Sequence, residues 1–183
     1  IYNNMDTYPQ KWTLLEIEIF ELLSNKAGEK LSQREIAKIL KVSPTTIKEP
    51  ARKLKEKNLI KIEKTKTINF ISFNRDEEKA INLKRAQNLK NTYTTGLTEH
   101  LKNELPGSTI IIFGSYSRGE DTNNSDIDIA VIERKEKKLT LNEYEKKLNR
   151  KININYYKTL KEINPELKNN ILNGIIINGS VEL

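Results

Sequence analysis

Two short β-branched runs on either side of a Gly-Ser step constrain the fold of this chain more than any other feature of its sequence. Residues 109–113 read Thr-Ile-Ile-Ile-Phe, and residues 126–132 read Asp-Ile-Asp-Ile-Ala-Val-Ile. Short apolar runs bounded by turn residues are typical of buried strands. Gly114 and Ser115 end the first run, and turn-forming residues fill positions 121–125. The sequence therefore predicts two core strands joined by a polar segment.

Asp126 and Asp128 are spaced so that their carboxylates come together. Residues two apart in a strand point to the same face of a sheet, while Ile127, Ile129 and Val131 point into the core. Two neighbouring carboxylates repel each other unless a cation lies between them, and Mg²⁺ prefers carboxylate and phosphate oxygens. We therefore expect Asp126 and Asp128 to be metal ligands and the acidic residues of a catalytic site.

Gly114 and Ser115 form a dipeptide that is suited to binding phosphate. Glycine has no Cβ, so a phosphate can approach its backbone closely. A serine at the start of a helix adds a hydroxyl where backbone N–H groups favour an anion. A phosphate-binding step that faces a metal-binding carboxylate pair suits nucleoside triphosphate chemistry, in which the metal bridges the phosphates and stabilises the departing pyrophosphate.

Residues 113–131 as a whole resemble the minimal nucleotidyltransferases of the DNA polymerase β superfamily. The pattern is Gly-Ser, ten residues, then Asp-Ile-Asp, and the intervening Arg-Gly-Glu step and the Ser before the first Asp also match. The resemblance implies a triphosphate held by Gly114, Ser115 and Arg118, and a magnesium ion held by Asp126 and Asp128.

The resemblance continues to the C-terminus. A helix, a strand, a second helix and a terminal strand are predicted at residues 141–148, 151–157, 164–172 and 173–179. Together with the core strands, these elements predict a nucleotidyltransferase-like domain that covers residues 88–183.

The third acidic position of that family is where this chain departs from the pattern. Active members usually carry a further carboxylate on the strand after the helix, where it completes the metal site and helps to deprotonate the attacking hydroxyl. That strand here reads Lys-Ile-Asn-Ile-Asn-Tyr, and Asn153 is the residue that aligns with the missing acid. An asparagine oxygen coordinates a metal weakly, carries no charge and cannot act as a base.

The N-terminal part predicts three helices and a hairpin. The helices fall at residues 9–23, 32–40 and 43–57, and residues 59–73 alternate apolar and polar side chains around a charged turn, as a hairpin does. This order resembles a winged helix-turn-helix domain over residues 9–73. In that family the third helix enters the DNA major groove and the wing touches phosphates.

Positive charge gathers on the predicted third helix and wing. Residues 41–66 hold nine Lys or Arg against three Glu, a net charge of +6. Clustered positive charge favours a polyanionic partner, although a solvated lysine-rich surface, a protein-binding module and a dimerisation unit remain alternatives. The DNA-binding residues predicted on this basis are Thr45, Thr46, Lys48, Arg52, Lys53, Lys57, Lys64 and Lys66.

Residues 75–105 predict one long helix, or two helices with a break at Gly96. The apolar side chains step by two to four residues, which predicts one packed face made of Ile81, Leu83, Ala86, Leu89, Tyr93, Leu97, Leu101 and Leu105. Residues 74–87 are predicted to be a helical connector between the two domains.

Composition excludes several kinds of chemistry. The chain has no cysteine and a single histidine, so disulfides, thiolate metal sites and a Ser-His-Asp triad are not expected. No stretch approaches the about 18 consecutive apolar residues of a membrane span, and no signal-like run follows the first residues. We expect a cytoplasmic protein.

The sequence predicts an α+β chain, with a winged helix domain followed by a small mixed-sheet domain, and leaves two functions open. The first is an enzyme that binds Mg-NTP and transfers a nucleoside monophosphate to an acceptor, such as a protein hydroxyl as in the antitoxin branch of the family. The second is a DNA-binding regulator, for which a homodimer is one expected state, whose nucleotidyltransferase-like domain senses nucleotide or mediates dimerisation. Asn153 favours the second function, and the intact Gly-Ser and Asp-Ile-Asp steps favour nucleotide binding in both.

Overall fold

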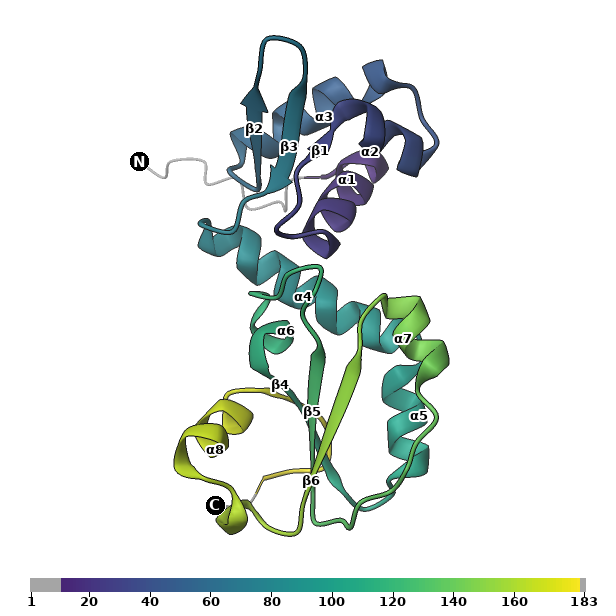
Figure 1. Cartoon of the computed structure of the whole chain (residues 1–183), viewed down its shortest axis with the longest axis vertical. Helices are drawn as coiled ribbons and strands as arrows, with labels where there is room; N and C mark the ends of the chain where they lie inside the picture. Colours follow the sequence, from purple (N-terminus) through teal and green to yellow (C-terminus); the bar gives the residue numbers. More distant parts are fainter. Residues whose placement is uncertain (1–10, 182–183) are drawn as a thin grey trace, which may run out of the picture. The chain divides into compact units, whose positions relative to one another are not determined.

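The computed structural model describes residues 11–181, which form two compact units (Figure 1). Along the chain, the boundary between them falls between Glu77 and Glu78. The first two residues of the predicted first helix, 9–10, lie outside the described residues. Among the described residues, no helix has both the length and the apolar character needed to cross a membrane.

The three helices of the first unit begin at side-chain caps. Thr13 and Ser32 each form a capping box with a glutamate three residues later, and Ser43 caps the third helix ahead of a proline. A cap satisfies backbone N–H groups that have no partner inside the helix. The helices are α1 (Leu14–Asn25), α2 (Gln33–Leu40) and α3 (Pro44–Glu56).

A three-stranded antiparallel sheet completes the first unit. Its order is β1-β3-β2, where β2 and β3 form the predicted hairpin and β1 adds a short edge strand that the sequence did not predict. The strands are β1 (Leu31–Ser32), β2 (Ile60–Lys64) and β3 (Asn69–Phe73). Three helices followed by a hairpin confirm the expected winged-helix order.

Helix α3 runs through Pro50 without interruption. Proline has no N–H and so cannot bond the carbonyl of Thr46 one turn earlier. The buried face of the helix, Ile47, Ala51 and Leu54, is 2% exposed or less and packs against α1 and α2. This packing holds the helix together across the missing hydrogen bond.

The second unit is built on a four-stranded mixed sheet. Its order is β6-β5-β4-β7, in which β5 and β6 run parallel and the other neighbouring strands run antiparallel. The mixed sheet confirms the predicted α+β class. The strands are β4 (Thr109–Phe113), β5 (Ile127–Ile132), β6 (Ile152–Tyr157) and β7 (Ile175–Asn178).

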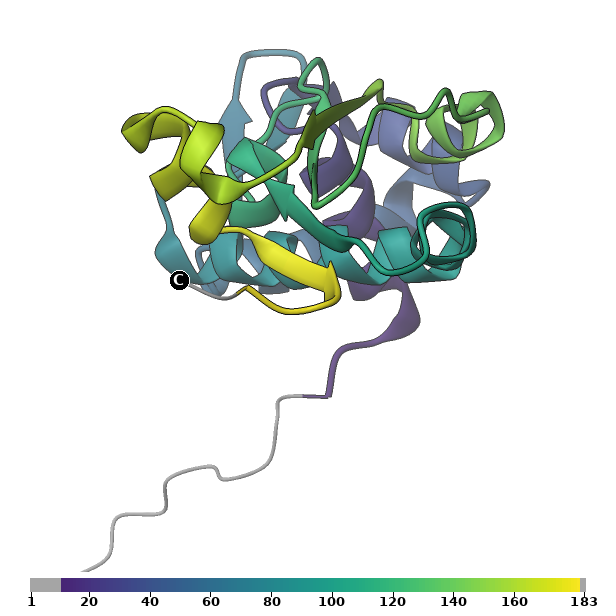
Figure 2. The same ribbon diagram turned by 90° about the horizontal axis from the view of Figure 1, so that it is seen from below.

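Helices cover both faces of this sheet, as the view in Figure 2 shows. One core cluster joins Ile127, Ile129 and Val131 to the face covered by α4, α5 and α7, and the other joins Ala130 and Ile132 to the face covered by α8. Gly96 separates α4 from α5, as expected. The helices are α4 (Glu78–Thr94), α5 (Leu97–Glu104), α6 (Gly114–Arg118), α7 (Asn142–Leu148) and α8 (Pro165–Leu172), with a 3₁₀ turn η1 (Leu160–Glu162).

The predicted packed face is right near α5 and only partly right in α4. Leu97, Leu101 and Leu105 are fully buried, and Leu89 packs against the same core cluster. Ala86 is exposed and Tyr93 is 51% exposed, whereas the buried positions are Ala80, Lys84, Asn88 and Thr92. The buried face is largely polar because its side chains pair inside the protein, so apolar spacing could not identify it. All of α4 lies within the second unit, including residues 78–87, which the sequence had assigned to a connector.

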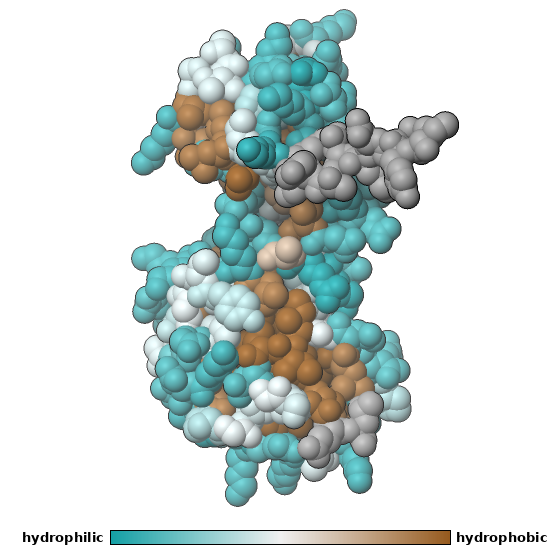
Figure 3. Space-filling model, turned by 180° about the vertical axis from the view of Figure 1, so that it is seen from behind, coloured by the Kyte–Doolittle hydropathy of each residue, from teal (hydrophilic) through white to brown (hydrophobic). Residues whose placement is uncertain are grey.

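The second unit also presents apolar surface. Figure 3 shows brown, hydrophobic atoms on the face of this unit that is seen from behind. In this unit, the exposed large apolar side chains among the described residues are Tyr93 and Ile176, the latter 46% exposed on the edge strand β7.

Candidate functional site

Asp126, Asp128 and Asn153 come together at one end of the mixed sheet. Asp128 lies on β5 and pairs in parallel register with Asn153 on β6, while Asp126 lies just before β5. The side-chain Nδ2 of Asn153 is 3.0 Å from Asp126 Oδ2 and 3.4 Å from Asp128 Oδ1. The two carboxylates therefore converge on a single point, as the strand spacing predicted.

The chemistry of the partners determines how the Asn153 amide is turned. Ionised carboxylates only accept hydrogen bonds, and the NH₂ group of an amide is its only donor. Nδ2 therefore faces the acids and donates to both, while Oδ1 points away. A half turn of the amide about its last side-chain bond would present Oδ1 to the same point instead.

Gly114 lies directly against Asp128. Its φ is +74°, and a Cβ added to it would lie 2.9 Å from Asp128 Oδ2. The left-handed backbone favours glycine here, and a side chain at this position would displace the Asp128 carboxylate. Ser115 follows as the second residue of α6, half-buried. A phosphate that approaches the Gly114 backbone would lie beside a carboxylate of the metal-binding pair.

Arg118 and Glu120 contact each other rather than the aspartates. Arg118 Nε donates to Glu120 Oε2 at 2.8 Å, and a guanidinium nitrogen donates to Asn170 Oδ1 on α8 at 2.9 Å. Within residues 11–181, no three His, Cys, Asp or Glu side chains gather as a metal site. The structure therefore brings together two carboxylates and one amide, without a third acid from the described residues.

This donor set nevertheless fits Mg²⁺ accompanied by a nucleotide. Magnesium keeps several waters and is usually bound through one or two protein carboxylates plus substrate phosphates. The two converging carboxylates supply that number, and the phosphate would lie against the backbone of Gly114, which has no Cβ. Asp126, Asp128, Gly114 and Ser115 are the residues that would hold the pair.

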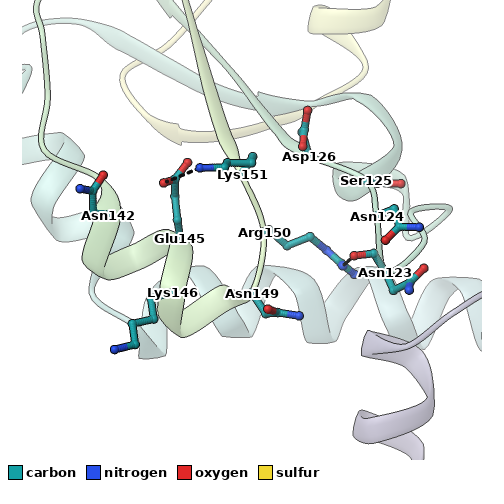
Figure 4. A pocket seen from close by; sticks show the side chains of 10 residues that line it. All are labelled: Asn123, Asn124, Ser125, Asp126, Asn142, Glu145, Lys146, Asn149, Arg150 and Lys151. Carbon is teal, nitrogen blue, oxygen red and sulfur yellow. Dashed lines mark hydrogen bonds and ion pairs between the residues drawn. The ribbon is translucent and has the colours of Figure 1, made fainter.

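A polar pocket of about 440 Å³ opens beside Asp126, on the β6 side (Figure 4). Figure 4 shows Asp126 and Ser125 on one side of the pocket, and on the other the Lys151–Glu145 ion pair, whose nitrogen and oxygen are 3.5 Å apart. Glu145 also accepts a hydrogen bond from the backbone N–H of Ile152. Most of the other lining groups are amides or cations: Asn123, Asn124, Asn142, Lys146, Asn149 and Arg150.

A buried ionic network lies under the site. Asp121 is 1% exposed, and its carboxylate accepts hydrogen bonds from Lys84 at 2.5 Å, Asn88 at 2.7 Å and Arg150 at 3.1 Å. A buried charge is tolerated only when it is paired and hydrogen-bonded. The network ties α4 to the loop after α6 and to the residue before Lys151.

Tyr116 joins α6 to the same network. Its hydroxyl donates to the carbonyl oxygen of Asn88 at 3.1 Å, and its own carbonyl accepts from Asn88 Nδ2 at 2.9 Å. Burial and, secondarily, the nearby Asp121 carboxylate raise the pKa of the Tyr116 hydroxyl above its ordinary value, so the hydroxyl stays protonated. The sequence analysis did not predict this network. The one sequence feature that could have indicated it is the spacing of Lys84 and Asn88, two polar residues four positions apart on one face of α4.

The residues predicted to bind DNA divide into two groups in the structure. Arg52 pairs with Glu49 and Glu56, and the Arg52 hydrogen bond lowers the pKa of Glu49. Lys53 lies 3.5 Å from the almost fully buried Glu16, and Lys57 Nζ lies 5.3 Å from the centre of the Trp12 ring. These three cations are held within the unit. The hydroxyls of Thr45 and Thr46 contact Ser43 Oγ at the start of α3.

Lys48, Lys64 and Lys66 form the second group. Lys48 and Lys64 line a groove of about 470 Å³ between α3 and the hairpin, together with Arg52 and Lys55. Lys66 is exposed in the turn between β2 and β3. A groove lined by four cations and one acid, Glu49, is suited to a phosphate backbone.

Comparison with family models finds both predicted domains. A model described as a nucleotidyltransferase domain matches residues 96–178, and a model described as winged helix-turn-helix DNA-binding matches residues 14–61. The predicted fusion of these two domains is confirmed. The matched segments include Gly114, Ser115, Asp126, Asp128 and Asn153 in the first model and all of α3 in the second.

Among solved structures, the chain is similar to a mutant of ZitR from Lactococcus lactis. The two are 24% identical, with a TM-score of 0.40, over 53% of this chain and 64% of that chain. The match therefore spans less than two thirds of that protein. No curated protein gives a significant match.

Proposed function

We propose that this chain, which joins a winged helix-turn-helix domain to a nucleotidyltransferase domain, is a DNA-binding regulator that binds Mg-NTP at Gly114, Ser115, Asp126 and Asp128. The observation that carries the proposal is the geometry at the sheet end. Two carboxylates converge beside a left-handed glycine, where a Cβ would press on Asp128 Oδ2, and an amide occupies the third position. A cytoplasmic location would give access to both ligands.

The nucleotide is held by complementary groups. Asp126 and Asp128 offer charged oxygens to the metal. The Ser115 hydroxyl donates a hydrogen bond to a phosphate oxygen, and the phosphate lies against the backbone of Gly114. When bound, the metal bridges the phosphates and offsets their negative charge. Arg118 stays a predicted phosphate ligand, and its ion pair with Glu120 would have to open for it to reach one.

Asn153 supports binding over rapid transfer. General-base catalysis requires a group that takes up a proton from the attacking hydroxyl, and a neutral amide does not do so. Glu120, an acid of the same motif, is paired with Arg118. The chain therefore has the features of a nucleotide-binding site and lacks, among its described residues, a third acid at the reacting end.

The DNA-binding part of the proposal rests on the cationic groove of the first unit. Lys48 and Lys64 approach it from α3 and from the hairpin, the two elements that contact DNA in winged helix domains. Their charges would neutralise phosphates and release counterions. Lys53 and Lys57 stay predicted contacts, but each has an internal partner that DNA would have to replace.

One observation favours a second function, transfer of a nucleoside monophosphate. Phosphoryl and nucleotidyl groups move with attacking and leaving oxygens roughly in line. If the pyrophosphate lies against Gly114 on the β4 side, the acceptor has to approach from the β6 side, where the polar pocket opens beside Asp126. A protein hydroxyl is one acceptor that such an open pocket could receive.

Calorimetry tests nucleotide binding. We expect Mg-dependent binding of at least one of ATP, GTP, CTP and UTP, and its loss in Asp126→Ala with Asp128→Ala, because the metal loses both charged ligands. Glu162→Ala with Glu166→Ala is the matched control, since it removes two exposed carboxylates from the same unit. Absence of binding to the wild-type protein would sink the nucleotide part of the proposal.

Gel shifts with random-sequence duplexes test DNA binding. Lys48→Ala with Lys64→Ala should weaken binding and make the plot of log affinity against log salt shallower by about 1.8, if each lysine neutralises one phosphate. Lys158→Ala with Lys161→Ala removes the same charge from the second unit as a control. An equal effect of the two pairs would place the interface elsewhere. Lys53→Ala is a poor probe because it leaves the buried Glu16 without its cation.

A further inference from the structure

The Asn153 amide lies at the point where a metal would contact both acids. One nitrogen donates to Asp126 and to Asp128, so the two carboxylate oxygens that converge on a metal in the proposed site converge here on an N–H donor. Asn153 is exposed and lies on the edge strand β6. Its amide is free to turn without disturbing the core.

We infer that Asn153 competes with the metal for the two aspartates, so that a divalent cation enters together with the nucleotide rather than ahead of it. The inference rests on the proposed Mg-NTP site and adds an order of binding to it. Its basis is that an amide nitrogen that donates hydrogen bonds cannot also be a metal ligand. Metal entry must therefore break both hydrogen bonds.

The charge of the site explains why binding of the metal alone is weak. With an acid at position 153, three negative groups would attract the cation, whereas this chain has two, and both are already hydrogen-bonded. Hydrogen bonds to charged groups are among the stronger ones in proteins. Turning the amide could present Oδ1 to the metal. A neutral oxygen, however, offsets only part of the free energy of the two hydrogen bonds that are broken.

The triphosphate changes this balance because it brings charged oxygens of its own. Magnesium prefers such mixed coordination by one or two carboxylates and by phosphates. By linkage, nucleotide should strengthen metal binding by the same factor by which metal strengthens nucleotide binding. In the absence of nucleotide, the Asn153 amide therefore disfavours metal binding. When the triphosphate binds, the amide turns away and the metal contacts both aspartates.

Removing the amide distinguishes competition from coordination by the sign of its effect. If Asn153 competes, Asn153→Ala frees the aspartates and tightens binding of the metal alone. If Asn153 is instead a ligand through Oδ1, the same change weakens it. Asn155→Ala is the matched control, because Asn155 lies two residues along β6 on the same face and opposite Ala130 rather than an acid.

The experiment titrates the full chain with Mn²⁺ as a paramagnetic probe, alone and with non-hydrolysable analogues of the four nucleoside triphosphates. Without nucleotide, Asn153→Ala should bind Mn²⁺ about tenfold more tightly than the wild type, the scale of one hydrogen bond to a charged group. Asn155→Ala should match the wild type. Asn153→Asp, which adds the missing charge, should bind Mn²⁺ more tightly still.

The two hypotheses fail separately. Unchanged or weaker Mn²⁺ binding by Asn153→Ala without nucleotide would overturn the competition, whatever the nucleotide does. Failure of all four analogues to tighten Mn²⁺ binding by the wild type would instead count against the proposed Mg-NTP site. Circular dichroism of each variant shows whether it is folded, and Asn153→Ser replaces Asn153→Ala if the alanine variant is not.

Discussion

At the scale of single residues, Asp121 links three segments of the second unit outside the proposed nucleotide site. The sequence placed it in a turn, yet its carboxylate is buried and bonded to Lys84, Asn88 and Arg150. Turn composition indicated a connection between strands, but the partners are 29 to 37 residues away along the chain. A contact of that range has no signature in local sequence.

Asp121→Asn should destabilise the protein strongly. The change removes the buried carboxylate charge that pairs with Lys84 and Arg150, and breaking a buried pair from one side typically costs about 3–5 kcal/mol. Urea unfolding followed by circular dichroism measures the loss. Glu162→Gln, an exposed acid in η1, should stay within about 0.5 kcal/mol of the wild type. A loss below about 1 kcal/mol for Asp121→Asn would mean that the network is not held together by this charge.

Asn153→Asp should increase any transfer activity. It restores a carboxylate opposite Asp128, where a general base can contribute about 10²- to 10⁴-fold. The measurement follows label from the α-phosphate of each nucleotide to protein, nucleic acid or small molecules in a cell extract. A rate equal to that of the wild type would show that the absent acid is not what limits transfer.

At the scale of elements, the close approach of α6 to α4 depends on Gly119. A Cβ on Gly119 would collide with the backbone of α4, at Ile81 O and 2.8 Å from Arg85 N. Gly119 also has φ of +77°, a left-handed conformation. The helix that carries the phosphate-binding step can therefore lie against α4 only while this residue has no side chain.

Gly119→Ala and Gly107→Ala form a matched pair. Both glycines have positive φ, but a Cβ on Gly107 would meet nothing within 4 Å. The backbone strain alone should cost about 1–2 kcal/mol in each variant, and the collision should add about 1–3 kcal/mol in Gly119→Ala. Thermal unfolding of both variants gives the difference. Equal losses would indicate that α6 moves aside without penalty.

At the scale of the whole molecule, the order of elements followed closely from sequence, and both core strands, the hairpin and the second and third helices lie where they were expected. The first helix begins at Leu14, later than the predicted start at residue 9. Alternation of apolar residues and helix capping depend on neighbouring residues, so both can be recognised in a single sequence. The sequence also placed Asn153 opposite the two aspartates, because strand periodicity fixes which side chains share a face. The buried face of α4 escaped prediction because its polar side chains are satisfied by distant partners.

If this chain is a nucleotide-responsive regulator, its two ligands should influence each other. Mg-NTP should change DNA affinity by at least about fivefold, and DNA should change the affinity for Mg-NTP by the same factor. Fluorescence anisotropy of labelled DNA and calorimetry of nucleotide measure the two sides. Independent binding, with both factors near one, would mean that the two domains act separately and would favour the transferase reading.

The buried contacts of α4 also bear on how such a protein could be assembled in evolution. Lys84 and Asn88 follow the hairpin closely in sequence, yet they are part of the core of the unit that begins at Glu78. A recombination event that exchanged the DNA-binding half for another would leave the remaining domain whole only if the junction fell at or before codon 78. A junction ten codons later would remove Lys84, one of two cations that pair with Asp121.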